Sequence, residues 1–321
     1  MRLLVTGGMG FIGSNFIRYG LKNHSSWKIT NLDKLTYAGN LNNLKDTEKD
    51  SRYHFVRGDI NDRELINGLL GQGFDAIVNF AAGSHVDRSI VDSSPFIDTN
   101  VKGTQVLLEA ARQHQIPKFI QISTDEVYGS LGAGGKFTEE SPLLPSSPYA
   151  ASKAAADLLC HAYYQTYGLA IIITRCSNNY GPYQFPEKFI PLVITNALEN
   201  KPIPVYGDGL NVRDWIYVED HCRAIDLIIQ RGKPGMIYNI GANNERTNVD
   251  LVYKILDMLA KPKNLITFVA DRPGHDRRYA LDTTTITQEI GWELRHSFEK
   301  ALKDTVNWYV EHEAWWREIK S

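Results

Sequence analysis

Short apolar runs alternate with longer segments of helical periodicity through the first half of the chain. Near-continuous apolar runs predict buried strands at 2–6, 28–32, 53–57, 75–82, 118–122 and 170–174. Helical patterns predict helices from the Gly-rich turn to about 22, at 95–114 and at 149–167. Strands that lack in–out alternation are typical of a parallel sheet covered by helices on both faces. The pattern therefore predicts an α/β fold with a doubly wound parallel sheet.

The pattern changes after Cys176 and indicates a second, smaller α/β unit. Turn-rich segments are followed by a helix to about 200, short strands at 202–206 and 212–218, a helix at 220–230 and a strand at 236–240. We predict a nucleotide-binding domain over 1–180, which 212–245 rejoins, and a substrate domain from 181–211 and 246–321. A C-terminal amphipathic helix carries Phe298, Leu302, Thr305, Val306 and Tyr309 on one side. The aromatic side chains of Trp308, Trp315 and Trp316 are expected to pack on their own domain rather than on a membrane or partner.

Composition narrows the function classes. The 321 residues are 43% hydrophobic with a formal net charge of -2, which suits a globular core and offers no basic block for nucleic acid. No apolar run approaches the roughly 20 residues that a membrane span needs, and Met1 leads directly into a strand instead of a signal peptide. Three scattered cysteines indicate a reduced cytoplasmic protein, and the nine histidines show no metal-ligand spacing.

A Gly-rich turn follows the first predicted strand and indicates a dinucleotide site. Gly7, Gly10 and Gly13 have the spacing that permits a tight turn and lets backbone N–H groups approach a pyrophosphate at a helix N-terminus. Asp33 ends the next strand 20 residues after Gly13, where a carboxylate can accept both ribose hydroxyls and repel a 2′-phosphate. This favours NAD over NADP and a Rossmann-type domain. Asp59 ends a later strand, where it either meets the adenine or caps the following helix.

Candidate catalytic groups come from a strand end and a nearby helix start. Thr124, Asp125 and Glu126 follow the strand at 118–122, and Tyr149 and Lys153 lie one helical turn apart on the helix at 149–167. Such a set suits acid–base chemistry because the backbone elements fix the groups around a substrate. Lys153 on the same helical face favours the Tyr149 phenolate.

With these motifs in this order, the chain resembles the extended short-chain dehydrogenase/reductase superfamily and, within it, the nucleotide-sugar 4,6-dehydratases. The resemblance covers essentially the whole length, and its most specific signal is Thr124-Asp125-Glu126, because the related sugar epimerases have small or uncharged residues there. Gly83 departs from the family, whose members carry Glu before the Ser-His-Val-Asp segment. This departure bears on substrate choice more than on the reaction.

The resemblance implies an NAD-dependent lyase that acts on a nucleoside-diphosphate sugar, with dTDP-glucose favoured over UDP-glucose. The implied cofactor residues are Gly7, Gly10, Phe11, Ile12, Gly13, Asp33, Lys34, Thr36, Asp59, Ile60, Ala81, Ala82, Thr99, Tyr149, Lys153 and Asn179. The implied substrate residues are Ser84, His85, Thr124, Asn178, Lys188, Tyr206, Arg213, Asn248, Arg272 and His275. It also implies a homodimer that forms through the helices at 95–114 and 149–167.

The expected reaction oxidises C4 of the sugar, eliminates water across C5 and C6, and reduces C6. In this hypothesis Tyr149 removes the O4 proton, Glu126 takes the C5 proton and Asp125 protonates the leaving hydroxyl. Two alternatives stay open: a nucleotide-sugar 4-epimerase, which shares the fold, Tyr149, Lys153 and NAD, and a non-catalytic NAD-binding scaffold.

Overall fold

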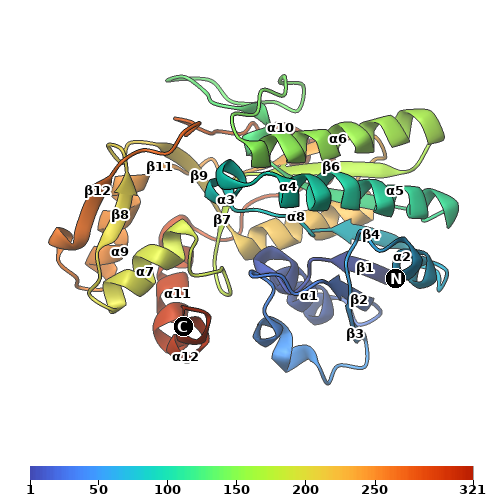
Figure 1. Cartoon of the computed structure of the whole chain (residues 1–321), viewed down its shortest axis with the longest axis horizontal. Coiled ribbons are helices and arrows are strands. Elements are labelled where there is room, and N and C mark those ends of the chain that lie inside the picture. The colour runs from blue at the N-terminus through green and yellow to red at the C-terminus, as the bar shows by residue number, and fades with distance from the viewer. Residues whose placement is uncertain (321) are drawn as a thin grey trace.

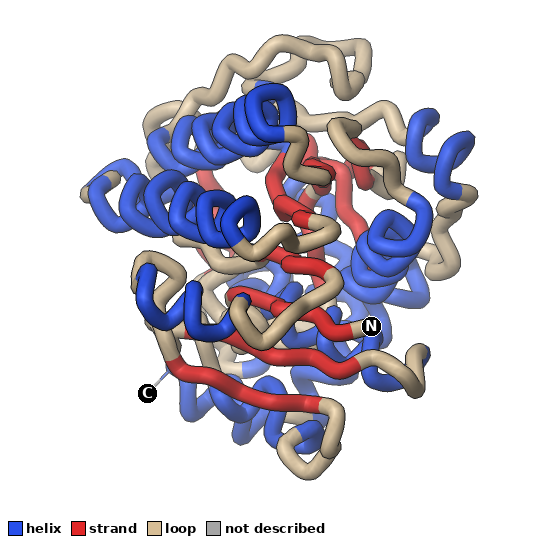
Figure 2. Tube along the Cα trace, turned by 90° about the vertical axis from the view of Figure 1, so that its right-hand side faces the viewer, coloured by secondary structure: helices blue, strands red, loops and turns tan. Residues whose placement is uncertain are grey.

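A computed structural model of the chain, described over residues 1–320, contains a seven-stranded parallel sheet between two layers of helices (Figures 1 and 2). The strand order is β10-β6-β5-β4-β1-β2-β3. The strands are β1 (Arg2–Thr6), β2 (Lys28–Asp33), β3 (Tyr53–Arg57), β4 (Ala76–Asn79), β5 (Phe119–Thr124), β6 (Ile171–Cys176) and β10 (Ile237–Ile240). The predicted doubly wound parallel sheet is confirmed.

Two separate apolar cores attach the helices to the two faces of this sheet. One face packs against α1 (Phe11–Asn23), α8 (Val218–Arg231) and α10 (Thr284–Ile290). The opposite face packs against α2 (Arg63–Leu70), α5 (Thr104–Gln113) and α6 (Pro148–Tyr167). Every residue of β4, β5 and β6 is buried, as central strands with both faces covered require.

The helix predicted at 95–114 contains a segment that the sequence pattern did not reveal. A short α4 (Ser94–Phe96) continues into a π-helical segment (Ile97–Gly103) and then into α5. π-Helical turns are rare and often lie at functional sites. Here the segment brings Thr99 to the central pocket and Asn100 to the loop at Gly83, where the Asn100 side chain accepts a hydrogen bond from the Gly83 N–H at 2.8 Å.

Helix α6 begins and ends where its sequence predicts. The Ser147 hydroxyl accepts a hydrogen bond from Ala150 N at 3.1 Å, and Pro148 occupies the first turn, where it needs no N–H partner. Gly168 ends the helix in the left-handed conformation with φ +67°. The helix thereby presents Tyr149 and Lys153 to the carboxyl end of β5.

A smaller unit, at the left of Figure 1, has its own apolar core. It contains a three-stranded sheet of β11 (Glu245–Thr247), β9 (Val212–Tyr217) and β7 (Asn178–Tyr180), and a two-stranded sheet of β12 (Ile266–Val269) and β8 (Ile203–Tyr206). Its helices are α7 (Phe189–Leu198), α9 (Asn248–Met258), α11 (Phe298–Glu311) and α12 (Glu313–Lys320). Earlier in the chain, a short helix α3 (Val86–Val91) precedes α4. Strand β10 lies in the main sheet, as predicted for 236–240, whereas β9 belongs to the three-stranded sheet.

The C-terminal aromatic residues pack inside the protein, but they also reach the nucleotide-binding part of the chain. Trp316 is fully buried in the core of the smaller unit. Trp315 also donates an indole hydrogen bond to Asn43, which lies in the segment after β2. The prediction that these residues pack on their own domain is therefore correct for Trp316 and incomplete for Trp315. Within residues 1–320 no helix is long and apolar enough to cross a bilayer.

Candidate active site

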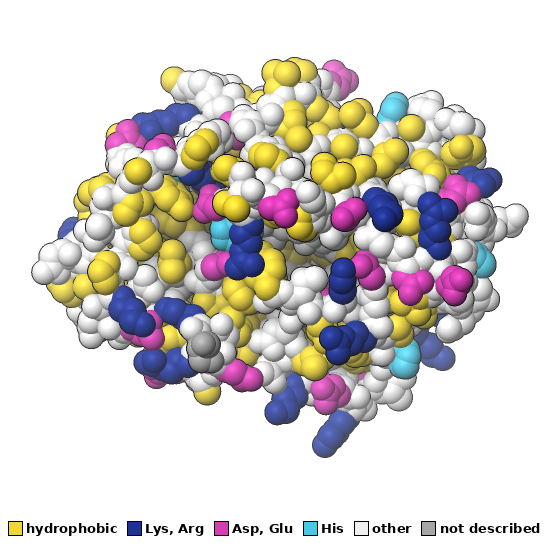
Figure 3. Space-filling model, viewed as in Figure 1, with side chains coloured by type: hydrophobic (Ala, Val, Ile, Leu, Met, Phe, Trp, Pro, Cys, Tyr) yellow, Lys and Arg dark blue, Asp and Glu magenta, His cyan; other side chains and the backbone are white. Residues whose placement is uncertain are grey.

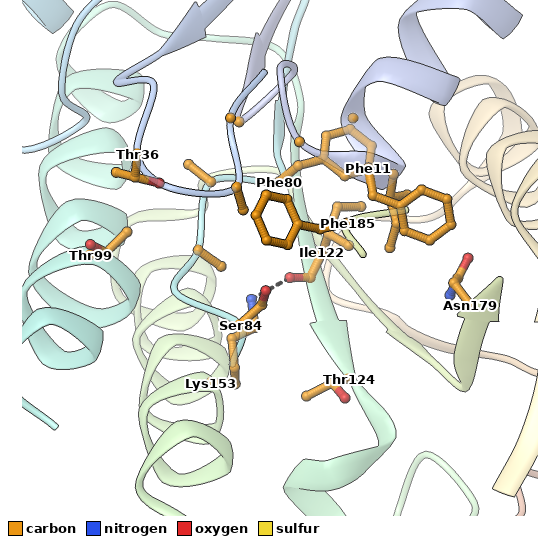
Figure 4. Close-up of a pocket in the computed structure, with 18 of the residues that line it drawn as sticks. Phe11, Thr36, Phe80, Ser84, Thr99, Ile122, Thr124, Lys153, Asn179 and Phe185 are labelled. Carbon is orange, nitrogen blue, oxygen red and sulfur yellow. Dashed lines mark hydrogen bonds between the residues drawn. The ribbon is translucent and has the colours of Figure 1, made fainter. Parts of the chain in front are cut away.

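One elongated pocket, with a cavity volume of about 320 Å³, runs along the carboxyl ends of the sheet strands. Side chains and backbone from the ends of β1, β2, β3, β4, β5 and β6 all line it. This is the place where parallel α/β sheets bind their ligands. Figure 4 shows side chains from several of these strand ends converging on it, with Phe11, Phe80 and Phe185 gathered on one side and Lys153 and Thr124 on the other.

The Gly-rich turn is shaped so that the backbone can approach a ligand closely. Gly7 has φ +70°, and a Cβ placed on it would lie 2.6 Å from Ala81 N. A Cβ on Gly13 would lie 2.5 Å from Gly7 O, whereas Gly10 faces more open space. Two of the three glycines are therefore required by close packing, and the helix that follows directs its N-terminus at the pocket. These features fit the diphosphate of a dinucleotide.

Asp33 lies in the pocket in a conformation that its own backbone neighbours fix. Its carboxylate accepts hydrogen bonds from Met9 N at 2.9 Å and Leu35 N at 2.8 Å. Burial raises the pKa of Asp33, and these two backbone donors lower it. Lys34, which could have neutralised this carboxylate, instead pairs with Asp59 at 2.6 Å. Asp59 also accepts from Asn61 N at 2.9 Å, so it both lines the pocket and stabilises the turn before α2.

All sixteen residues predicted to hold the cofactor line this pocket. The backbone turn, the buried acceptor at Asp33 and the elongated shape together fit NAD. A resident NAD would place its diphosphate at the Gly-rich turn, its adenosine ribose at Asp33 and its nicotinamide near Tyr149 and Lys153.

The five predicted catalytic residues meet in the same pocket. Glu126 N donates to the Thr124 hydroxyl at 3.3 Å, and that hydroxyl also contacts Asp125 Oδ1 at 3.3 Å. Lys153 Nζ donates to the Ile122 carbonyl at 2.6 Å, the dashed contact in Figure 4. The end of β5 thus carries both carboxyl groups and also fixes the amine of α6.

The two adjacent carboxyl groups have different electrostatic surroundings. Burial raises the pKa of Asp125 well above its usual value, and the charge of Glu126 raises it further. Burial also raises the pKa of Glu126, but Arg272 and Arg213 lower it. Adjacent acids that interact in this way hold unlike protonation states. Asp125 is therefore the better proton donor of the pair and Glu126 the better base.

Tyr149 and Lys153 are both shielded from solvent. Burial raises the pKa of the Tyr149 phenol well above its usual range, and the charge of Glu126 adds to this. Burial lowers the pKa of Lys153, while the Asp157 carboxylate on the next helical turn raises it. Asp157 is itself held by Arg175 at 2.9 Å in a pair that is almost completely buried. The sequence pattern gave no indication of this supporting pair.

The predicted substrate residues divide into two groups. Ser84, Thr124, Asn178 and Lys188 line the pocket, and Lys188 Nζ donates to Ser84 O at 2.7 Å. The remaining six lie outside its lining: His85, Tyr206, Arg213, Asn248, Arg272 and His275.

Several residues of the second group are engaged with protein groups. Tyr206 and Arg272 both contact the Asp87 carboxylate, at 3.1 and 3.2 Å. Arg213 donates to the Asp276 carbonyl at 2.8 Å and lies over the Tyr279 ring. His275 pairs with Asp271 at 2.6 Å.

Some residues that line the pocket were not predicted from the sequence. The four residues Glu187, Gln184, Phe185 and Cys176 line the pocket but were not among the predicted site residues, although Glu187 lies in the Pro186-Glu187-Lys188 segment that carries part of the family resemblance. The only available signal was proximity, since Glu187 precedes Lys188 and Cys176 ends β6. Gly83 lies beside this region, and a Cβ on it would meet the Phe96 ring at 3.0 Å, so a larger residue here requires that ring to move.

The fold, the Gly-rich turn and the Tyr149–Lys153 pair define an NAD-binding member of the extended short-chain dehydrogenase/reductase superfamily. The chain belongs to the GDP-mannose 4,6 dehydratase family, whose model matches residues 4–305. It is 51% identical to the dTDP-glucose 4,6-dehydratase of Streptomyces niveus, over all of this chain and 96% of that protein. The predicted superfamily is thereby confirmed.

Solved structures agree with this assignment. The dTDP-glucose 4,6-dehydratase DesIV from Streptomyces venezuelae, with NAD and TYD bound, superimposes with a TM-score of 0.97 at 51% identity, covering 99% of this chain and 100% of that one. The UDP-glucose 4-epimerase of Thermus thermophilus in complex with NAD has a TM-score of 0.90 at 30% identity, covering 97% and 100%. NAD as the predicted cofactor is confirmed.

Proposed function

We propose that this protein is a hydro-lyase that converts dTDP-glucose to dTDP-4-keto-6-deoxyglucose and water. The observation that carries the proposal is the adjacent pair Asp125 and Glu126 at the end of β5, in the same pocket as Tyr149 and Lys153, with Asp125 buried and Glu126 partly buried. An epimerase needs the tyrosine and the lysine, but it eliminates no water and has no use for two further acids. The 51% identity to a full-length dehydratase supports the same choice.

Each protein group has a defined proton to move in this scheme. Bound NAD supplies a reversible hydride acceptor for the oxidation at C4 and the reduction at C6. Tyr149 acts as the phenolate, which the positive charges of Lys153 and of the oxidised nicotinamide favour against the effect of burial, and it accepts the O4 proton while Thr124 donates a hydrogen bond to the C4 oxygen. The C4 ketone acidifies C5–H, so the Glu126 carboxylate takes that proton while Asp125 protonates the departing C6 hydroxyl. Glu126 then returns its proton to C5, and the net change is loss of one water.

The substrate's diphosphate and nucleoside are assigned to the residues next to the pocket. Lys188, Arg213 and Arg272 lie close enough to act electrostatically on Glu126, so this end of the site is cationic. Cationic side chains with several donors suit a diphosphate. His275 joins this group, and His85 and Ser84 bind the sugar. Asn178, Tyr206 and Asn248 are assigned to the sugar and base.

A homodimer in the cytoplasm completes the proposal. Several large apolar side chains on and around α4 and α6 are exposed, among them Val91, Ile97, Leu158 and Tyr167. Figure 3 shows hydrophobic atoms spread over this face. A second copy of the chain that pairs these helices would cover them. The cysteines Cys160, Cys176 and Cys222 are free and buried, which fits a reducing compartment.

Product analysis tests the function. The purified protein is incubated separately with dTDP-glucose and UDP-glucose, and products are identified by mass and by the alkali-sensitive absorbance of the ketone. Loss of water from dTDP-glucose in preference to UDP-glucose is the expected result. Formation of a C4 epimer of unchanged mass would instead identify an epimerase. Sedimentation velocity of the same sample, compared with Leu158→Glu, tests the dimer.

A further inference from the structure

The last helix of the chain, α12, is connected by hydrogen bonds to the Gly-rich turn at the opposite end of the sequence. The Trp315 indole N–H donates to Asn43 Oδ1 at 3.1 Å. Asn43 is buried, and its Nδ2 donates to the carbonyl of Met9 at 2.8 Å. Met9 lies within the Gly-rich turn, and its N–H donates to Asp33 Oδ2 at 2.9 Å. Three consecutive contacts thus join the C-terminal helix to the carboxylate assigned to the cofactor ribose.

The same C-terminal segment also contacts the other side of the cofactor pocket. The Tyr309 hydroxyl of α11 donates to the Gln184 carbonyl at 2.5 Å, and Gln184 Nε2 donates to the Asn179 carbonyl at 2.9 Å. Gln184 and Asn179 both line the pocket. Trp308 and Trp315 enclose the Tyr183 ring, with centroids 4.7 and 5.8 Å away. The C-terminal helices therefore contact residues that hold both walls of the pocket.

Asn43 has little freedom to replace its tryptophan partner. Its side chain is 2% exposed, and its own carbonyl accepts a hydrogen bond from Arg18 Nε at 3.1 Å. A buried amide oxygen that loses its hydrogen-bond donor keeps the cost of removal from water, and the side chain can relieve that cost only by moving. Any shift is transmitted to Met9, because Asn43 Nδ2 holds the Met9 carbonyl.

We propose that α12 acts as a latch on the dinucleotide: through Trp315 and Asn43 it fixes the Gly-rich turn and slows release of NAD. Trp315 is a positioning residue in this scheme, since it acts on the cofactor only through Asn43 and Met9. Retention suits a reaction that returns its hydride to the same sugar, because the cofactor then has no need to leave between turnovers. The inference rests on NAD binding alone and not on which sugar is dehydrated.

The rate of cofactor release tests the proposed latch directly. The protein is loaded with NADH and mixed with a large excess of NAD⁺, and the loss of bound NADH fluorescence gives the dissociation rate. Trp315→Phe keeps an aromatic ring but removes the N–H donor, and we expect it to speed release by roughly 3- to 10-fold, the range for one lost hydrogen bond. Trp308→Phe removes an indole from the same aromatic cluster without touching Asn43, and we expect release within twofold of the unaltered protein.

A second variant separates loss of the Trp315–Asn43–Met9 connection from general disruption of α12. Asn43→Asp keeps an acceptor for Trp315 but replaces the group that donates to Met9, so it is expected to speed NADH release as well. Thermal melting of each loaded variant shows whether it is folded. An unchanged release rate in folded Trp315→Phe, or an equal acceleration in Trp308→Phe, would overturn the latch. Because no sugar is present, neither result depends on the dehydratase assignment.

Discussion

Replacement of Asp125 by Asn tests the division of labour between the two adjacent carboxyl groups. Asp125 is 2% exposed, and burial together with the charge of Glu126 raises its pKa well above the usual value, which favours its protonated form. Asparagine has nearly the same shape but no acidic proton. Oxidation at C4 depends on Tyr149 and is expected to persist. Loss of water is expected to slow by roughly 10²- to 10⁴-fold, the usual contribution of a positioned acid, or about 3 to 5 kcal/mol of barrier.

A single-turnover experiment distinguishes the two steps. Enzyme with bound NAD is mixed with dTDP-glucose, NADH absorbance reports the oxidation, and the 6-deoxy-4-keto product is quantified after quenching. In Asp125→Asn we expect NADH to form and persist. Glu140→Gln, which alters an exposed carboxyl on the following loop, is the matched control and is expected to behave normally. Product formation at the normal rate in Asp125→Asn would refute the assignment of Asp125 as the acid.

The same substitution has a consequence for stability whose sign follows from the raised pKa. In the unfolded chain Asp125 ionises near 3.8, whereas in the folded protein it remains protonated to higher pH. The folded state therefore binds more protons above pH 3.8, and the free energy of unfolding of the unaltered protein falls as pH rises towards the folded-state pKa. This penalty is about 1.4 kcal/mol per pH unit and is absent in Asp125→Asn. Urea unfolding at pH 4 and pH 7 should show the variant gaining relative stability at pH 7.

Three further substitutions probe the remaining groups. Tyr149→Phe should slow the first hydride transfer by roughly 10²-fold or more, seen as a loss of NADH formation, because no base then takes the O4 proton; normal NADH formation would exclude Tyr149 as that base. Asp157→Asn removes the carboxylate that raises the pKa of Lys153, so the alkaline limb of the pH–rate profile should move to lower pH by about one unit. An alkaline limb at unchanged pH would show that the Asp157 charge does not affect Lys153. Asp33→Ala should weaken NAD binding, measured by titration calorimetry, and unchanged affinity would rule out the ribose contact.

Much of the nucleotide-binding part could be predicted from local sequence, because its motifs follow the ends of strands. Gly7, Asp33 and Thr124 each come directly after or at the end of an apolar run, and parallel strands bring such positions to one edge. Spacing along one helix places Lys153 next to Tyr149 for the same reason. These relations depend only on the strand and helix periods, which can be read directly from the sequence.

The rest depends on long-range packing that no local pattern records. Arg213 is assigned to the substrate's diphosphate, and its guanidinium is held in place by the carbonyl of Asp276, 63 residues further along. The link between Trp315 and Asn43 joins residues 272 positions apart. Such pairs depend on how distant parts of the chain pack together, so composition and local spacing do not predict them.

The junction between β6 and β7 limits how the two parts of the protein move. Strand β6 ends at Cys176 in the seven-stranded sheet, β7 begins at Asn178 in the three-stranded sheet, and only Ser177 lies between them. Ser177 N is itself tied to the Ile240 carbonyl at 2.9 Å. Opening at this crossing is therefore restricted to a small hinge rotation, without a free linker. An insertion here would change the distance between the parts that hold the nicotinamide and the sugar, so the spacing of one residue at this crossing is itself a requirement of the site.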